Sequence, residues 1–169
     1  MEDSWVTRIT KIEPNKITLR GYKLDELMGK IKFSDVIYLL IKGDLPNDSE
    51  SKMFEAILVS SVDHGVTPPS CLATRNSAST GAPINGALAS GILSINKFHG
   101  GAIETCMEDL LLMHNLSQNS GLSIKEIAQK FYKEKKEKGQ KISGFGHRIH
   151  TDDPRTKKLF SLSKELNIA

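Results

Sequence analysis

The stretch APINGALASGILSIN, residues 82–96, mixes alanine, glycine and serine with isoleucine and leucine and contains no charged residue. A helix of this composition has no polar face to turn toward water, so we expect it to be buried on most sides. Glycine costs a helix up to about 1 kcal/mol per site. Tight packing against a neighbouring backbone, including that of another subunit, is the expected compensation. The stretch therefore predicts a helical fold built around a buried helix of small residues.

Helix start signals occur on both sides of this stretch. Asn, Ser and Asp side chains cap helices, a Glu three residues later completes a capping box, and proline is tolerated in the first turn. The signals here are Asn47 with Glu50, Pro68 with Pro69, Ser123 with Glu126, and Asp153 with Pro154. They predict several further helices along the chain, one of which ends at Gly139.

The N-terminal part adds one β element and one more helix. Residues 6–20, VTRITKIEPNKITLR, are rich in β-branched residues around a Glu-Pro-Asn-Lys turn, which predicts a short hairpin. In FSDVIYLLIKG, residues 33–43, Ser34 is the expected N-cap and Gly43 the residue that ends the helix. The predicted fold class is therefore all-α with a short N-terminal β-hairpin.

The composition excludes several classes of protein. Hydrophobic residues make up 38% and charged residues 25% of the 169 residues, as in ordinary globular chains. The net charge of +3 is too small for a dedicated nucleic-acid binder. The longest apolar run, VIYLLI at 36–41, is too short to cross a membrane, and the N-terminus lacks a signal-peptide pattern. Cys71 and Cys106 form no disulfide framework or metal motif, so we expect a cytoplasmic protein with reduced thiols.

Three of the five histidines lie at glycine-flanked junctions between expected helices: His64 in DHG, His99 in FHGG and His147 in GFGH. Glycine lets a backbone approach a ligand closely, and a helix N-terminus favours the neutral imidazole, which donates one hydrogen bond. The alternative is a turn histidine whose ring is satisfied by the backbone. His114 falls in the middle of an expected helix and is interpreted as structural.

The segment GFGHRIHTDDPR, residues 144–155, gathers many titratable groups. A metal site, an acid–base or anion-binding site and an exposed polar loop are all compatible with it. His147 and His150 resemble a metal-binding pair, but helical metal histidines usually stand at i, i+4, and Asp153 already serves as an N-cap. We therefore predict no metal. Arg155 lies in the first turn of the last helix, where a cation opposes the helix dipole, so we expect an anionic partner, such as a ligand carboxylate.

Two further stretches have simple interpretations. KFYKEKKEKGQK, residues 130–141, contains six lysines and ends just before the glycine loop. A solvated helix face is its ordinary interpretation, and contact with the phosphates of a ligand is the alternative. The polar stretch at 116–122 is the one candidate domain boundary, which predicts domains at 1–115 and 116–169.

Taken together, the motifs resemble those of the citrate synthase family. GFGHRIHTDDPR resembles the family's GxGHxV…DPR segment, FHGGA its second histidine motif, and DHG its first. LRGYKLDEL and FSDVIYLLIKGDLP resemble the family's start, where an RGY element precedes a helix and a G-x-LP turn. The resemblance covers nearly the whole chain in the right order. DHGVTPPSCLATRNSASTGAP looks closer to the citryl-CoA lyase branch, which includes the C-terminal module of ATP citrate lyase.

The resemblance implies an all-helical homodimer with a large domain and a small domain that closes over the ligand. It implies cleavage or formation of a C–C bond between acetyl-CoA and oxaloacetate, with citryl-CoA as the joined species and the CoA thioester as substrate rather than a separate cofactor. By motif match, His99 would stabilise the enolate through the thioester oxygen, and His147 would polarise the oxaloacetate ketone. Arg155 would bind a carboxylate of oxaloacetate, and His64 would help to hold the same ligand.

Two departures from the family pattern matter. The gap between His147 and Arg155 is one residue shorter than in many citrate synthases, so the CoA-binding residue is not assigned. The family's catalytic aspartate and further arginines follow the DPR segment, and no carboxylate within residues 1–169 matches that aspartate. We therefore expect a truncated chain whose small domain, 116–169, is incomplete at its C-terminal end. A non-catalytic dimeric module that binds CoA or a dicarboxylate, and an unrelated metal-binding helical protein, are the alternatives.

Overall fold

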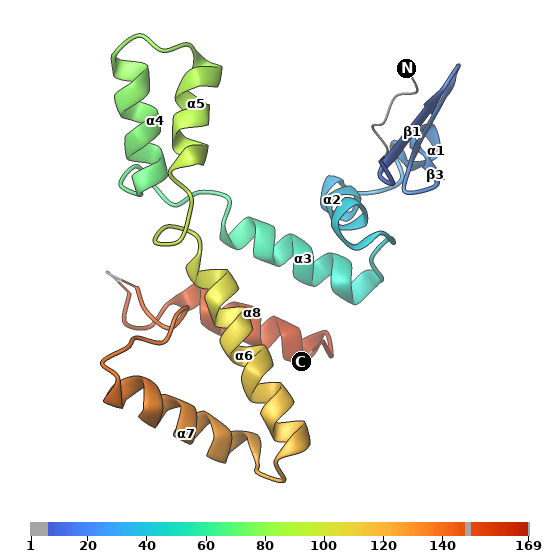
Figure 1. Cartoon of the computed structure of the whole chain (residues 1–169). Coiled ribbons are helices and arrows are strands. Elements are labelled where there is room, and N and C mark those ends of the chain that lie inside the picture. Colours follow the sequence, from blue (N-terminus) through green and yellow to red (C-terminus); the bar gives the residue numbers. More distant parts are fainter. Residues whose placement is uncertain (1–6, 148–149, 169) are drawn as a thin grey trace, which may run out of the picture. The chain divides into compact units, whose positions relative to one another are not determined.

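The computed structural model describes residues 7–147 and 150–168. The chain divides into two compact units. The first combines the chain up to Asp63 with the C-terminal segment from Asp153, and the second runs from His64 to Asp152. Figure 1 shows that the described elements are mainly helices, with a small sheet near the N-terminus. The predicted fold class is therefore confirmed.

The first unit begins with a three-stranded antiparallel sheet in the order β1, β2, β3 (Figure 1). β1 (Thr10–Glu13) pairs with β2 (Lys16–Leu19), with Thr10 opposite Leu19. β2 also pairs with β3 (Tyr22–Lys23). The predicted hairpin is confirmed over its described residues. The third strand is too short to produce an alternating pattern that a sequence could reveal.

Helices complete the first unit and contact one another along α3. They are α1 (Leu24–Leu27), α2 (Phe33–Lys42), α3 (Asp48–Ser60) and α8 (Pro154–Glu165). α3 contacts both α2 and α8. The segment that carries Arg155 is therefore anchored on a helix from the N-terminal third of the chain.

Helix ends in this unit agree with the predicted signals, with one exception. Asn47 and Glu50 form the predicted capping box, and Gly43 ends α2 with a φ of 98°. The predicted N-cap Ser34 is wrong, because Lys32 occupies the N-cap position and the helix begins at Phe33. Ser34 is instead the second helical residue and is only 8% exposed, so its hydroxyl lies within the unit rather than over the helix end.

The second unit consists of two helical hairpins. Its helices are α4 (Pro69–Ser79), α5 (Ile84–Leu93), α6 (Ala102–Asn119) and α7 (Ile124–Glu137). α4 and α5 lie side by side, and α6 contacts α7 (Figure 1). The predicted capping box of Ser123 and Glu126 starts α7, and Gly139 follows its end with a φ of 64°.

The interpretation of the polar stretch at 116–122 as a linker is wrong for its first four residues. Residues 116–119 form the last turn of α6, because a polar helix end can be solvated without leaving the helix. The boundary between residues 115 and 116 therefore falls inside a helix. The assignment of residues 1–115 and 116–169 to a large and a small domain stays a prediction.

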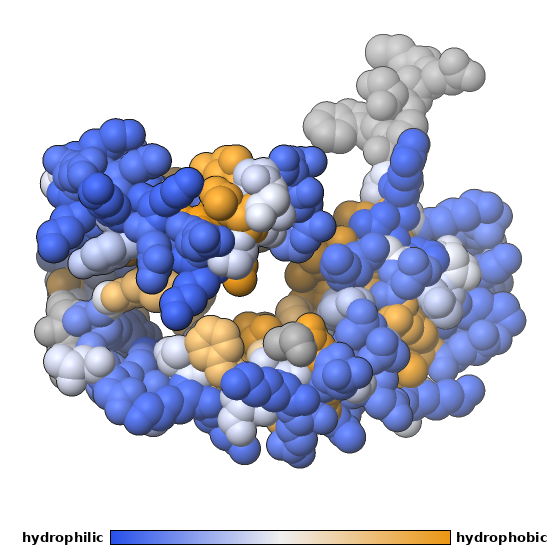
Figure 2. Space-filling model, turned by 90° about the horizontal axis from the view of Figure 1, so that it is seen from below, coloured by the Kyte–Doolittle hydropathy of each residue, from blue (hydrophilic) through white to orange (hydrophobic). Residues whose placement is uncertain are grey.

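The expectation that residues 82–96 are buried on most sides is wrong for the chain taken alone. In α5, Ala87 and Gly91 are buried against α4, but Ile84 and Leu93 are each 79% exposed. Among the described residues of this unit, α4 is the helix that packs closely against α5, and side chains on the other side of α5 stay exposed. Figure 2 shows hydrophobic side chains exposed among hydrophilic ones.

Within residues 7–147 and 150–168, no helix combines the length and apolar composition needed to cross a bilayer.

Candidate active site

His99 lies in a tight turn between α5 and α6. The backbone groups of Asn96 and His99 exchange two hydrogen bonds of 2.8 Å, and the N–H of Gly101 donates to the Asn96 carbonyl at 3.2 Å. Gly100 has a φ of 97°, a conformation that glycine adopts at little cost. The FHGG motif therefore fixes the backbone of His99 just before the N-terminus of α6.

The ring of His99 is held at the N-terminus of α4. Its Nε2 accepts the backbone N–H of Ser70 at 3.4 Å and lies 3.0 Å from the Ser70 hydroxyl oxygen. A backbone N–H can only donate, so Nε2 serves as an acceptor and the ring proton belongs on Nδ1. In this tautomer the Nδ1–H of His99 is the nitrogen donor that faces away from Ser70.

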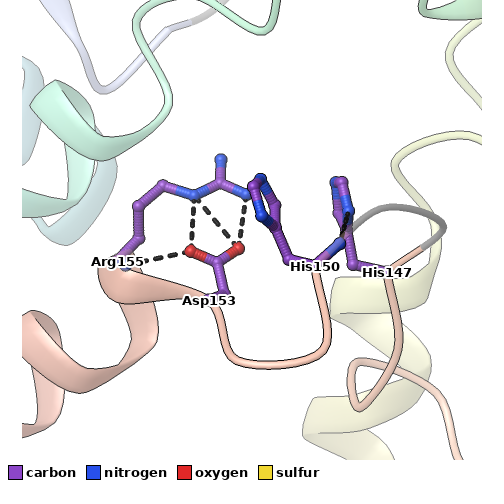
Figure 3. A network of polar contacts seen from close by, with 4 residues as sticks. All are labelled: His147, His150, Asp153 and Arg155. Carbon is purple, nitrogen blue, oxygen red and sulfur yellow. Dashed lines mark hydrogen bonds and ion pairs between the residues drawn. The ribbon is translucent and has the colours of Figure 1, made fainter.

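His64 and His147 lie close together in the second unit, although they are far apart in the sequence. Their ring centroids are 5.7 Å apart with an interplanar angle of 85°. The ring of His150 lies 4.7 Å from that of His147 at 31°, and the N–H of His150 donates to Nδ1 of His147 at 3.1 Å. We call these three residues the histidine cluster. Figure 3 shows His147 and His150 as neighbours.

Arg155, in the first unit, has the anionic partner that its position predicts, and that partner is Asp153. The carboxylate of Asp153 receives Nε of Arg155 at 3.0 Å and Nη2 at 2.6 Å, and it also caps α8 by accepting the Arg155 N–H at 2.9 Å (Figure 3). These hydrogen bonds to Asp153 raise the pKa of Arg155 above its ordinary value. Nη1 of Arg155 has no partner among the described residues. The N–H groups of Nη1 are therefore the edge of the guanidinium that a ligand could reach.

A surface cavity lies beside Gly146, the residue before His147. It has a volume of about 390 Å³ and is lined by the end of α7 and the segment that follows it. Its lining includes Lys135, Lys136, Lys141, Tyr132 and Phe145. Cations next to exposed aromatic rings suit a ligand that carries both phosphates and an aromatic base.

The metal alternative finds no support in the described part of the chain. Within residues 7–147 and 150–168, no group of three or more His, Cys, Asp or Glu side chains is arranged to hold a metal ion. His114 lies exposed on α6, and no role in ligand binding is predicted for it.

Two contacts of the site carry no sequence signature. Ser70 is an ordinary serine after two prolines, and its role depends on a ring 29 residues away. Gly144 lies so close to Cys106 that a Cβ on the glycine would be 2.7 Å from the thiol sulfur. The glycine of GFGH is therefore required by packing against α6 as well as by its φ of 82°.

Comparisons with known proteins identify the family. The model of the family described as citrate synthase, C-terminal domain, matches residues 3–61 and 48–168. The chain therefore belongs to the citrate synthase family. It is 31% identical over 140 residues to the citrate synthase of Heyndrickxia coagulans, an alignment that covers 81% of this chain and 35% of that protein.

Solved structures agree with this placement. The structure of citryl-CoA lyase from Hydrogenobacter thermophilus matches with a TM-score of 0.84 and 40% identity, over 98% of this chain and 62% of that one. ATP citrate lyase from Methanothrix soehngenii, solved with citrate and coenzyme A, has the same fold with a TM-score of 0.83 at 24% identity, and the match covers 98% of this chain and 26% of that one. The chain thus spans about a third of the curated citrate synthase and less than two thirds of the solved citryl-CoA lyase.

Proposed function

We propose that this chain contributes the substrate-polarising groups of an enzyme that cleaves or forms the C–C bond between acetyl-CoA and oxaloacetate. Cleavage of citryl-CoA is the favoured direction, because the similarity to a citryl-CoA lyase covers 98% of the chain at 40% identity. The observation that carries the proposal is the bond from the Ser70 N–H to Nε2 of His99, which leaves Nδ1–H as a neutral donor.

In this proposal His99 acts on the thioester. When the C–C bond of citryl-CoA breaks, its electron pair moves onto the acetyl group and forms an enolate whose charge rests on the thioester oxygen. A neutral N–H donor held toward that oxygen stabilises the charge as it develops, and such fixed donors are worth several kcal/mol. Ser70 keeps the ring in the required tautomer because its N–H occupies the other nitrogen.

His147 acts at the opposite end of the breaking bond. In synthesis the ketone of oxaloacetate takes up a proton and becomes the hydroxyl of citryl-CoA. In cleavage this hydroxyl gives up its proton as the ketone forms, and the acceptor of that proton is not assigned to a residue of this sequence. Since Nδ1 of His147 already accepts the His150 N–H, its Nε2–H would donate to this oxygen. His64 and the free Nη1 of Arg155 would hold the carboxylates of the dicarboxylate, as the family motifs imply.

The CoA part of the substrate would occupy the cavity at the end of α7. The phosphates of CoA would meet Lys135, Lys136 and Lys141, and its adenine would lie against Tyr132 or Phe145. The cavity adjoins Gly146, the residue before His147, which is consistent with a thioester that reaches the histidine cluster. The CoA thioester would be the substrate, with no separate cofactor.

A second copy of the chain is the proposed partner of the exposed side of α5. Ile84, Leu88, Ile92 and Leu93 are all more than half exposed there. Burial of such side chains between two subunits would stabilise a homodimer. We also place the protein in the cytoplasm, a proposal supported by the free thiols of Cys71 and Cys106.

The base that removes or returns the methyl proton is not assigned to any carboxylate of this sequence. We propose that the 169 residues bind the ligands and turn them over poorly without such a base, whose loss typically costs about 10²–10⁴-fold. This gap is also what favours the second candidate function, a dimeric module that binds CoA or a dicarboxylate without catalysis.

Ligand binding and proton exchange, measured on the same preparation of confirmed intact mass, separate these possibilities. Calorimetry should show that oxaloacetate and CoA bind, and His99→Ala and Arg155→Ala should weaken the binding of acetyl-CoA and oxaloacetate respectively. Exchange of deuterium into the methyl group of acetyl-CoA should be about 10²–10⁴-fold slower than with a relative. Absence of binding would refute the proposal. Exchange at the relative's rate would place the base within the chain, with Asp152 and Glu104 as the first residues to replace.

A further inference from the structure

His150 contacts His147 in two independent ways. Its ring lies 4.7 Å from that of His147 with a tilt of 31°, and its backbone N–H donates to Nδ1 of His147 at 3.1 Å (Figure 3). His64 contributes a third ring, edge to face with His147. His150 itself is exposed, so these contacts do not arise from burial in a core.

The backbone contact determines which nitrogen of His147 carries the proton. A neutral imidazole has one donor and one acceptor nitrogen, and the N–H of His150 requires Nδ1 to be the acceptor. The proton therefore belongs on Nε2.

The ring contact determines how His147 is oriented. A rotation of 180° about χ2 would exchange Nδ1 with a carbon and remove the acceptor from the N–H of His150. A neighbouring flat ring at stacking distance opposes this rotation, because the ring of His147 would have to sweep through it. The amide and the ring of His150 thus favour the same orientation of His147.

We propose that His150 is the positioning residue of His147: its amide selects the Nε2–H tautomer, and its ring holds the imidazole in one orientation. His147 would then be a fixed neutral donor for the ketone oxygen of a 2-oxo dicarboxylate. This last role of His147 rests on the proposed function, whereas its positioning by His150 does not. His150 touches no reacting atom in this scheme.

The tautomer can be observed without any ligand. In the 169-residue chain with ¹⁵N-labelled histidine rings, long-range ¹H–¹⁵N spectra distinguish the Nδ1–H, Nε2–H and doubly protonated states. At a pH where the ring is neutral, His147 should show the Nε2–H state. His150→Ala should lower its population, and His150→Phe, which keeps the amide and a flat ring, should restore it. His114→Ala, another exposed histidine, is the matched control and should change nothing.

Each outcome decides the proposal. An Nδ1–H state or an even mixture of tautomers in the wild-type protein would overturn it, whatever the variants do. An unchanged population in His150→Ala would overturn the role of the ring. His150→Pro, which removes the N–H, should produce a mixture of tautomers, and a persistent Nε2–H state in a variant with wild-type circular dichroism would overturn the role of the amide.

A binding measurement keeps this proposal separate from the proposed function. Calorimetry should show oxaloacetate affinity reduced on the order of tenfold in His150→Ala and restored in His150→Phe, since misplaced donors lose binding and rate. If neither the wild-type protein nor any variant binds oxaloacetate, the proposed function fails, while the tautomer result still stands. If all bind oxaloacetate equally, the ring of His150 does not position the donor.

Discussion

At the level of single residues, the candidate site depends on which neighbour bonds one ring nitrogen of each histidine and which neighbour bonds the guanidinium of Arg155. Ser70 occupies Nε2 of His99, and the His150 amide occupies Nδ1 of His147. Asp153 occupies two nitrogens of Arg155 and leaves Nη1 available. Each of these contacts fixes the orientation of the side chain that it holds, which is a condition for selective binding of a ligand oxygen.

The pair of Asp153 and Arg155 gives a prediction with a built-in control. Asp153→Asn keeps a good N-cap for α8 but removes the charge that holds the guanidinium. If Arg155 binds a ligand carboxylate, Asp153→Asn should preserve or raise oxaloacetate affinity in calorimetry, whereas Arg155→Ala should lower it. Loss of oxaloacetate affinity in both variants, with α8 intact by circular dichroism, would mean that the pair rather than the free arginine is what the ligand needs.

At the scale of elements, the sequence predicts what is local and misses what is distant. The capping boxes at Asn47 and Ser123 could be predicted because a cap involves residues only three positions apart. The N-cap at Ser34 could not, since burial of its side chain rather than its type decides where the helix begins. The three junction histidines were recognisable by their glycines, but their contacts with Ser70 and His150 depend on tertiary packing.

Two glycines of α5 differ in a way that only the packing reveals. A Cβ at Gly91 would overlap the Thr74 side chain and lie 3.0 Å from the carbonyl oxygen of Ser70. A Cβ at Gly86 would make ordinary contacts, with the ring of Pro83 at 3.7 Å and the Cβ of Ala82 at 3.9 Å. Thermal unfolding should therefore show Gly91→Ala destabilised by about 1–3 kcal/mol through overpacking. Gly86→Ala should be neutral or stabilised by up to about 1 kcal/mol, as expected for an open helical site. Equal effects would disprove the close packing of α4 on α5.

The end of α7 supports a prediction about CoA. Lys136 and Lys141 line the cavity, whereas Lys133 lies outside its lining and forms an ion pair with Glu137 instead. Lys136→Ala and Lys141→Ala should weaken CoA binding in a salt-dependent way and leave oxaloacetate binding unchanged. Lys133→Ala removes the same charge and should have little effect. A similar loss in all three variants would indicate a general field of the lysines rather than a defined site.

At the scale of the whole molecule, the described chain leaves large hydrophobic side chains uncovered in both of its units. Leu39 is the largest fully buried side chain, while Phe33 in the first unit and Phe98 in the second are more than four fifths exposed. A globular protein rarely leaves so much apolar surface in water. The proposed second copy would cover part of it along α5.

Ala89 offers a clean test of that homodimer. It is exposed on α5, so a charge there does not disturb the packing of α4. Ala89→Glu should dissociate the dimer in sedimentation while circular dichroism of the variant at low concentration stays helical. Gly91→Glu is a poorer test, because its side chain would strike Thr74 within the same chain. Sedimentation of Ala89→Glu and the wild-type protein as one identical species would contradict the proposed interface.

In the proposed function His147 presents a fixed neutral donor to the ketone of oxaloacetate, and the carbonyl carbon of the ligand reports on this contact directly. Oxaloacetate labelled with ¹³C at the ketone should show a downfield carbonyl signal when bound to the wild-type chain, because a donor at the oxygen withdraws electron density from the carbon. The displacement should shrink in His147→Ala under conditions where the ligand still saturates the protein. A bound signal at the position of free oxaloacetate, or a displacement that survives His147→Ala unchanged, would contradict this role of His147.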